Sequence, residues 1–199
     1  MARKLETKQL RVPMPVGIGA GLTEKCYLKH LRTLKGYKLD LKLRFFGSDN
    51  AYDMNKLVTD VLAGGAKAIC VYDKDVTRWN EEQRRLLADF EKKYVDNENV
   101  ILCGSMPCIE FWFLMHFRDT TRQYRTSKEV ITDLVHFLPG YEKKGTYLEK
   151  DAWVKTLLQE ERLTRAMTLS ERTAESDQPY SKVAEAIRAL DEKYQKKEE

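Results

Sequence analysis

The chain has 199 residues, of which 42% are hydrophobic, so it can build a sizeable core and general disorder is excluded. Its 35 basic and 31 acidic residues give a net charge of +4, which neither establishes nor opposes nucleic-acid binding. No apolar run approaches the roughly 18 residues of a membrane span, and the N-terminus lacks the apolar segment of a secretory signal. We therefore expect a cytoplasmic protein without membrane contact.

Strand and helix patterns alternate through about residue 118. The run 66–72 is continuously apolar, as in a buried parallel strand, whereas Tyr27, Leu31 and Leu34 recur at helical spacing. In chain order we predict a strand over 14–18, a helix over 22–34, a strand over 39–45, a helix over 54–62, a strand over 66–72, a helix over 81–94, a strand over 100–103 and a helix over 109–117. Such alternation predicts an α/β fold with a mostly parallel sheet flanked by helices.

Beyond residue 118 the strand signal stops. Helices are predicted over 127–137, 151–169 and 180–196, separated by short segments rich in Gly and Pro. We therefore divide the chain into a loose N-terminus (1–12), an α/β core (13–120) and a helical C-terminal extension (121–199) packed on that core.

The four cysteines do not have the spacing of a zinc site. Cys70 and Cys103 lie in apolar runs, and Cys103 and Cys108 are too far apart for a CxxC pair. We expect Cys26 and the other three to be reduced thiols, behaving as small hydrophobic side chains.

Asp73 and Asp75 follow the best candidate for a central strand, in the sequence VYDKD. In open parallel sheets the ligand crevice lies at the carboxyl ends of the strands, and two carboxylates one residue apart point to the same side. Such a pair suits a magnesium ion, which prefers oxygen ligands. A polar turn that merely ends the strand is the alternative.

The sequence GAGLTEK, residues 19–25, follows the first predicted strand and opens the first helix. Glycines there allow close approach to a phosphate, but the spacing matches neither GxGxxG nor GxxxxGK[ST]. Glu24 lies in the first helical turn, where an acid is also favoured by the helix dipole. If the first and third predicted strands are neighbours, Glu24 joins the aspartates at one sheet edge, and three converging carboxylates are costly without a cation.

The sequence SMPCIEFWFLMHF, residues 105–117, is the third informative segment. Glu110 and His116 lie in its very apolar helix. We expect His116 to be a core histidine, Glu110 to cap the helix or to orient another side chain by a hydrogen bond, and Ser105 to have a supporting role. The aromatic residues of this helix are interpreted as core packing.

The three motifs in this order resemble the RloB-type (AbiLii-like) proteins, which are small bacterial phage-defence proteins with a Toprim fold. The late segment SDQPYSKVAEAI resembles the closing helix of that family, and the resemblance covers roughly residues 14–190. It implies a Toprim-like core whose Glu24, Asp73 and Asp75 bind Mg²⁺ or Mn²⁺ for phosphodiester cleavage. It also implies an AAA-type ATPase partner.

One position departs from the family pattern. The first motif usually reads E-G-x-T-E; Gly21, Thr23 and Glu24 match it, but Ala20 stands where the leading Glu is expected. The missing carboxylate is the one usually assigned the acid-base role. Either Glu24 takes that role, or the chain is a weakened or inactive nuclease, or the residue at position 20 has been altered.

Two functions therefore compete. The first is a magnesium-dependent nuclease of a phage-defence system, in which Lys25, Lys74 and Arg78 steer the backbone of DNA or RNA. The second is a non-catalytic Toprim subunit that works with the ATPase. A generic nucleotide-binding regulator is disfavoured because the phosphate fingerprints are absent. The sequence leaves open the choice of DNA or RNA and a homo-oligomeric state.

Overall fold

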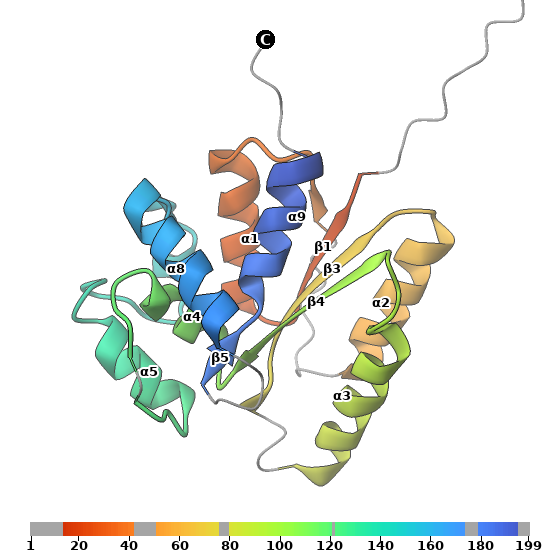
Figure 1. The fold of residues 1–199 in the computed structure, drawn as a ribbon, viewed down its shortest axis with the longest axis horizontal. Coiled ribbons are helices and arrows are strands. Elements are labelled where there is room, and N and C mark those ends of the chain that lie inside the picture. Colours follow the sequence, from red (N-terminus) through yellow and green to blue (C-terminus); the bar gives the residue numbers. More distant parts are fainter. Residues whose placement is uncertain (1–13, 42–50, 76–79, 121, 174–178, 195–199) are drawn as a thin grey trace, which may run out of the picture.

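The computed structural model describes residues 14–41, 51–75, 80–120, 122–173 and 179–194, and within them it contains one five-stranded sheet (Figure 1). The strands are β1 (Val16–Gly19), β2 (Asp40–Leu41), β3 (Ala68–Asp73), β4 (Val100–Met106) and β5 (Tyr180–Ser181). The helices are α1 (Leu22–Leu34), α2 (Ala51–Ala63), α3 (Glu81–Tyr94), α4 (Ile109–Met115), α5 (Ser127–Leu134), α6 (Gly145–Leu148), α7 (Ala152–Leu157), α8 (Glu160–Arg172) and α9 (Val183–Lys193).

The strand order is β2-β1-β3-β4-β5, and every neighbouring pair is parallel except β4 with β5. β3 lies at the centre, with Gly17 beside Ile69 on one side and Ile69 beside Ile101 on the other. The α/β class with a mostly parallel sheet flanked by helices is therefore confirmed. The first and third predicted strands are neighbours, as the argument for converging acids required.

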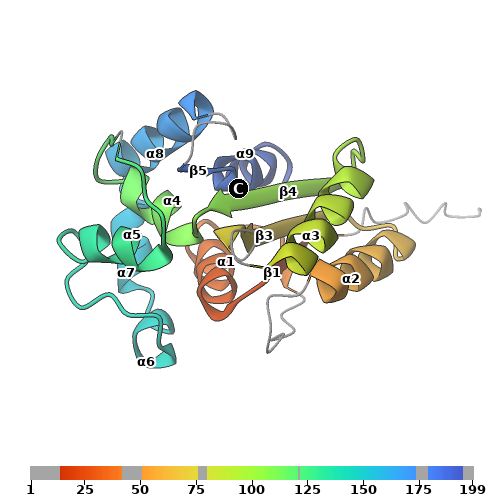
Figure 2. The same ribbon diagram turned by 90° about the horizontal axis from the view of Figure 1, so that it is seen from below.

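Alternation along β3 divides the interior into two cores, because successive side chains point to opposite faces of a sheet. Ile69 and Val71 enter the larger core, which contains residues of α1, α4, α5 and α7 to α9. Ala68, Cys70 and Tyr72 enter the smaller core, which α2 and α3 close. Figure 2 shows the consequence: α5 to α8 gather at one end of the molecule, and α2 and α3 lie at the other.

The sheet contains one strand, β5, that the sequence analysis did not predict. No strand was expected after residue 118, yet Tyr180 and Ser181 form β5 and pair with Met106 and Ser105 at the end of β4. A two-residue strand is too short to show a period of two. The helix predicted from residue 180 therefore begins only at Val183.

Several predicted boundaries also need correction. The helix predicted over 151–169 is two helices, because Gln159 has extended backbone angles (φ −57°, ψ 132°) and its carbonyl caps the start of α8. The helix predicted over 127–137 ends at Leu134, and the strand predicted over 100–103 continues to Met106. Of the strand predicted over 39–45, Asp40 and Leu41 form β2, and residues 42–45 lie outside the described residues, as does the predicted loose segment 1–12.

All four cysteines are buried free thiols, as expected. Burial raises the pKa of the Cys70 thiol far above its ordinary value, so it remains a neutral core side chain. None of the helices in the described segments has the length and apolar character needed to cross a membrane.

Candidate active site at the carboxyl ends of the parallel strands

The first turns of α1 and α4 lie beside the carboxyl ends of β1 and β3. Only two residues separate β1 from α1, and Gly19 makes this tight connection possible: a Cβ at Gly19 would lie 2.9 Å from the backbone nitrogen of Lys25. The first turn of α1 therefore lies against the end of β1. This turn presents Glu24 at the sheet edge that the sequence analysis identified.

Glu24 is almost fully buried, with 4% of the residue exposed. Its carboxylate folds back over the helix N-cap, Gly21, where an added Cβ would lie 2.7 Å from Oε2. A side chain at Gly21 would displace this carboxylate. The glycine therefore leaves the space in which the acid sits.

Asp73 is the last residue of β3, and its Oδ1 accepts a hydrogen bond from the backbone N–H of Ile109 at 2.7 Å. The pKa of Asp73 is raised well above its ordinary value, first because burial removes the carboxylate from water and then because Glu24 and Glu110 lie near it. Three acids from β3 and the first turns of two helices therefore act on one another. This mutual repulsion favours a cation at the site.

Glu110 follows Ile109 in α4 and is fully buried. Its Oε1 accepts a hydrogen bond from the hydroxyl of Tyr141 at 2.8 Å, and its Oε2 lies 3.0 Å from the ammonium of Lys143. The carboxylate is thus paired with two partners, as a buried acid must be. Neither partner was foreseen from the sequence, and the supporting role of Glu110 stays a prediction.

Tyr141 and Lys143 are the residues of the site that the sequence analysis missed. They lie between α5 and α6, outside the three motifs, and Tyr141 is 31 residues from Glu110 in sequence. No periodic pattern or motif marks them. The sequence around Gly140 indicates only a loop, so the tertiary structure alone identifies Tyr141 and Lys143 as part of the site.

Asp75 lies two residues beyond the end of β3 and is partly buried. It borders residues 76–79, which lie outside the described residues and include Arg78. The expectation that Asp75 and Asp73 bind one metal ion stays a prediction, as does the role of Arg78 in nucleic-acid binding.

The two remaining predicted phosphate-binding lysines differ in their surroundings. Lys74 is largely buried and forms an ion pair with Glu91 of α3 at 2.9 Å, close to the ring of Tyr180. Lys25 is partly exposed in the first turn of α1, where its backbone N–H bonds the carbonyl of Gly21. Of the two, Lys25 is the better placed for an incoming anion, since the charge of Lys74 is already compensated.

The contacts of Ser105 and His116 are those of residues that stabilise the fold. Ser105 lies beside Asp73 in the sheet and shares a hydrogen bond of 2.8 Å with the hydroxyl of Ser181, which joins β5 to the end of β4. His116, just beyond the other end of α4, bonds the carbonyl of Trp112 through Nδ1 at 2.9 Å. Burial lowers the pKa of His116 to about 4, so it is a neutral core histidine at pH 7.

Ala20 faces away from the acids. Its backbone N–H extends the β1–β3 ladder to the carbonyl of Val71, and its side chain packs against the core closed by α2 and α3. Asp73 and Glu110 lie on the opposite face of the sheet, where Ile109 belongs to the larger core. A carboxylate introduced at position 20 therefore starts on the other side of the sheet end.

The donor set suits a magnesium ion that is bound together with its substrate. Within the described segments, no group of three His, Cys, Asp or Glu side chains is arranged to hold a metal ion. Glu24 and Asp73 nevertheless lie near enough for their carboxylates to interact electrostatically, and Mg²⁺ commonly takes only one or two protein carboxylates and completes its shell with water and phosphate. The residues present fit that mode of binding.

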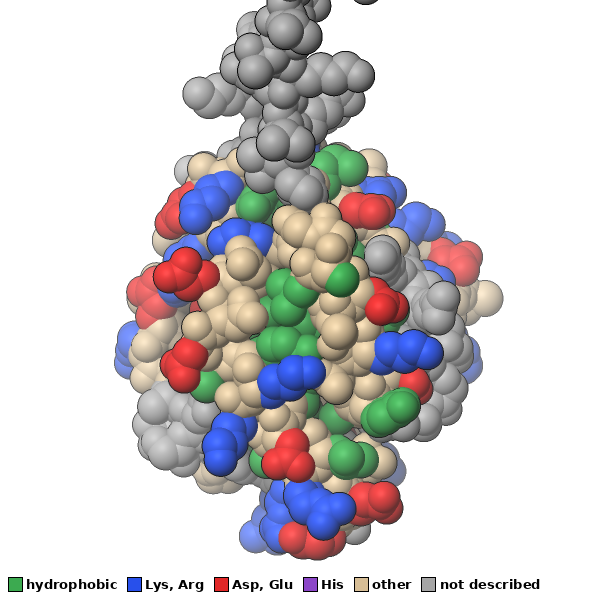
Figure 3. Space-filling model, turned by 90° about the vertical axis from the view of Figure 1, so that its right-hand side faces the viewer, with side chains coloured by type: hydrophobic (Ala, Val, Ile, Leu, Met, Phe, Trp, Pro, Cys, Tyr) green, Lys and Arg blue, Asp and Glu red, His purple; other side chains and the backbone are tan. Residues whose placement is uncertain are grey.

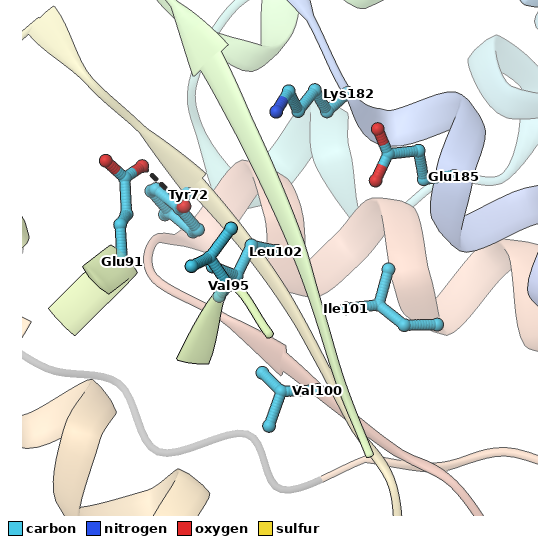
Figure 4. A pocket seen from close by; sticks show the side chains of 8 residues that line it. All are labelled: Tyr72, Glu91, Val95, Val100, Ile101, Leu102, Lys182 and Glu185. Carbon is cyan, nitrogen blue, oxygen red and sulfur yellow. Dashed lines mark hydrogen bonds between the residues drawn. The ribbon is translucent and has the colours of Figure 1, made fainter. Parts of the chain in front are cut away.

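Two other surfaces contrast with this site. A cavity of about 280 Å³ flanks β4, with Glu91 of α3 and Val95 just after α3 on one side and Lys182 and Glu185 on the other (Figure 4). Its charges are mixed, unlike those of the carboxylate cluster. On the face formed by α2 and α3, the described Lys and Arg side chains alternate with Asp and Glu around a central apolar strip, so these described residues form no basic patch (Figure 3).

Comparison with known proteins identifies one family. A family model described as RloB-like protein matches residues 18–190. The match spans the whole of the acid cluster, together with Tyr141, Lys143 and β5. Neither a curated protein nor a solved structure matches the chain.

Proposed function

This chain belongs to the RloB-like protein family, and from that premise we propose that it is a metal-dependent nuclease that cleaves phosphodiester bonds in nucleic acid. The observation that supports the proposal best is the position of Asp73, which is held at the end of β3 beside Glu24 and Glu110 although all three are acids. Proteins keep such repulsive clusters mainly at functional sites. The role in phage defence follows from the resemblance of the motifs.

In this proposal Glu24, Asp73 and Asp75 hold Mg²⁺ or Mn²⁺ at the sheet edge. The bound cation supplies Lewis acidity toward the scissile phosphate. The chain itself fixes the orientation of Asp73 through the N–H of Ile109 and leaves room for the Glu24 carboxylate at Gly21. Lys25 and Arg78 attract the phosphate backbone, and Glu24 either completes the shell of the cation or acts as the base.

Ala20 favours a second candidate, a non-catalytic subunit that binds nucleic acid and regulates an AAA-type ATPase. The side chain at this position packs toward α2 and α3 and supplies no acid-base group. A single missing acid-base group lowers a rate by roughly 10²–10⁴-fold. The chain would then retain metal and substrate without efficient cleavage.

A cleavage assay separates the two candidates. Labelled DNA and RNA are incubated with Mg²⁺ or Mn²⁺ and the wild-type chain, Asp73→Ala, Ala20→Glu or the control Asp60→Ala, which changes an exposed acid of α2. The nuclease proposal expects cleavage by the wild type and the control and its loss in Asp73→Ala. A gain of activity in Ala20→Glu supports the weakened-nuclease form. If neither the wild type nor Ala20→Glu cleaves, alone or with an ATPase subunit, the enzyme proposal is wrong.

A further inference from the structure

Lys143 reaches the acid cluster from a distant part of the chain. Its ammonium lies 3.0 Å from Oε2 of Glu110, and Glu110 directly follows the residue whose N–H holds Asp73. Lys143 is close enough to Asp73 for its charge to lower the pKa of that carboxyl, against the dominant effect of burial. The ammonium is therefore part of the site at the end of β3.

The pair of Lys143 and Glu110 spans the boundary between core and solvent. The side chain of Glu110 is 0% exposed, whereas that of Lys143 is 39% exposed. The hydroxyl of Tyr141 holds the other carboxylate oxygen at 2.8 Å, so the acid is fixed from two sides. An ammonium donates up to three hydrogen bonds, and one carboxylate oxygen does not exhaust them. Lys143 thus presents a fixed positive charge at the solvent side of an acidic site.

Neighbouring lysines lack this combination. Lys144 is 73% exposed and pairs with Glu142 at the surface, and Lys74 is 14% exposed and pairs with Glu91 of α3. A phosphodiester that approaches three acids needs compensating positive charge close to its oxygens. Among these lysines, Lys143 is the one that is anchored within the cluster and also reaches solvent.

We propose that Lys143 binds a non-bridging oxygen of the substrate phosphodiester, and that Glu110 and Tyr141 are positioning residues that hold its ammonium for that contact. This inference rests on the proposed nuclease function. The competing explanation is purely structural: Lys143 neutralises the buried Glu110 and never contacts substrate. The two explanations differ for a variant in which both charges are removed together.

The test compares the wild type with Lys143→Ala, Lys143→Arg, Lys143→Met/Glu110→Gln and the matched control Lys144→Ala. Binding of a fluorescent oligonucleotide is measured with Ca²⁺ in place of Mg²⁺, over a series of salt concentrations, and unfolding by urea reports stability. The double variant removes the buried charge and keeps an acceptor for Tyr141, so we expect it to be folded. Lys143→Arg retains a cation that can contact phosphate.

We expect Lys143→Ala and the double variant to bind about 10- to 100-fold more weakly. The slope of log affinity against log salt should fall by about one in both, a change that a structural role does not produce. Lys143→Arg should recover much of the binding, and Lys144→Ala should match the wild type. Wild-type binding by the double variant would overturn the role of Lys143 and leave the nuclease proposal intact. A wild-type chain that neither binds nor cleaves DNA or RNA would overturn both.

Discussion

A buried hydrogen bond between Tyr27 and Trp112 joins the two helices that carry the candidate site. The Nε1–H of Trp112 donates to the Tyr27 hydroxyl at 2.7 Å, and both side chains are fully buried. Tyr27 lies one turn after Glu24 in α1, and Trp112 lies one turn after Ile109 in α4. The bond therefore fixes α1 against α4 one helical turn away from the acids.

Replacing Tyr27 with Phe should destabilise the protein by about 1–3 kcal/mol, because the indole N–H stays buried without an acceptor. For a chain of this size each kcal/mol lowers the melting temperature by about 2–4 °C, so we expect a fall of about 2–12 °C. The ring itself is retained, so its contacts with Phe113 and Trp153 should persist.

Urea unfolding followed by fluorescence measures this effect, with an unchanged m value as evidence of an unchanged unfolding transition. Tyr147→Phe is the control, because the Tyr147 hydroxyl makes no hydrogen bond with the described residues while its ring packs on Tyr141. A double-mutant cycle with Trp112→Phe should give a coupling energy of about 1 kcal/mol. If Tyr27→Phe lies within about 0.5 kcal/mol of the wild type and the coupling is absent, the bond does not fix the two helices.

Three further predictions concern single positions. Asp73→Asn should melt at a higher temperature than the wild type at pH 7, and this gain should vanish near pH 4. The pKa of Asp73 is raised above its ordinary 3.8 in the folded state, so ionisation of this carboxyl at pH 7 destabilises the folded protein. The side-chain oxygen of Asn can still accept the hydrogen bond from the N–H of Ile109. Melting temperatures measured from pH 4 to pH 7 test this, and parallel curves for the two chains would contradict it. His116 should contribute a loss of up to about 3 kcal/mol as the pH falls from 6.5 to 4, opposite in sign to the contribution of Asp73, because the unfolded chain takes up a proton that the buried imidazole, with a pKa of about 4, does not. His116→Phe should lack this contribution in urea unfolding. Gly19→Ala should destabilise the fold, because the new Cβ meets the backbone of α1. Gly21→Ala should chiefly displace the Glu24 carboxylate and weaken the binding of Mn²⁺ measured by calorimetry. Equal losses of stability in the two variants would refute this distinction.

The proximity of Glu24 to Asp73 was predictable, because regular periodicity locates both residues. A helical pattern begins shortly before Glu24, an apolar run ends just before Asp73, and parallel strands bring their carboxyl ends to one edge. The face of Ala20 was also predictable: Val16 and Ile18 alternate with glycines, and Ala20 continues their register toward α2 and α3.

Other features depend on contacts that no local pattern records. β5 is specified by its pairing with Ser105 and Met106, which lie far from it in sequence. Tyr141 and Lys143 reach Glu110 from an irregular segment, where no helical or strand pattern indicates which side chains turn inward. The break at Gln159 likewise has no Gly or Pro to announce it.

The contact between the segment after α1 and the end of the described chain has a consequence for protein synthesis. The hydroxyl of Tyr37, just after α1, donates to Asp191 of α9 across 154 residues of sequence, and the N–H of Lys38 bonds the carbonyl of Tyr194. At the usual rate of translation these partners leave the ribosome about 8–30 s apart. Throughout that interval the segment that follows α1 lacks its partners in and beside α9, so this part of the packing forms only late in synthesis.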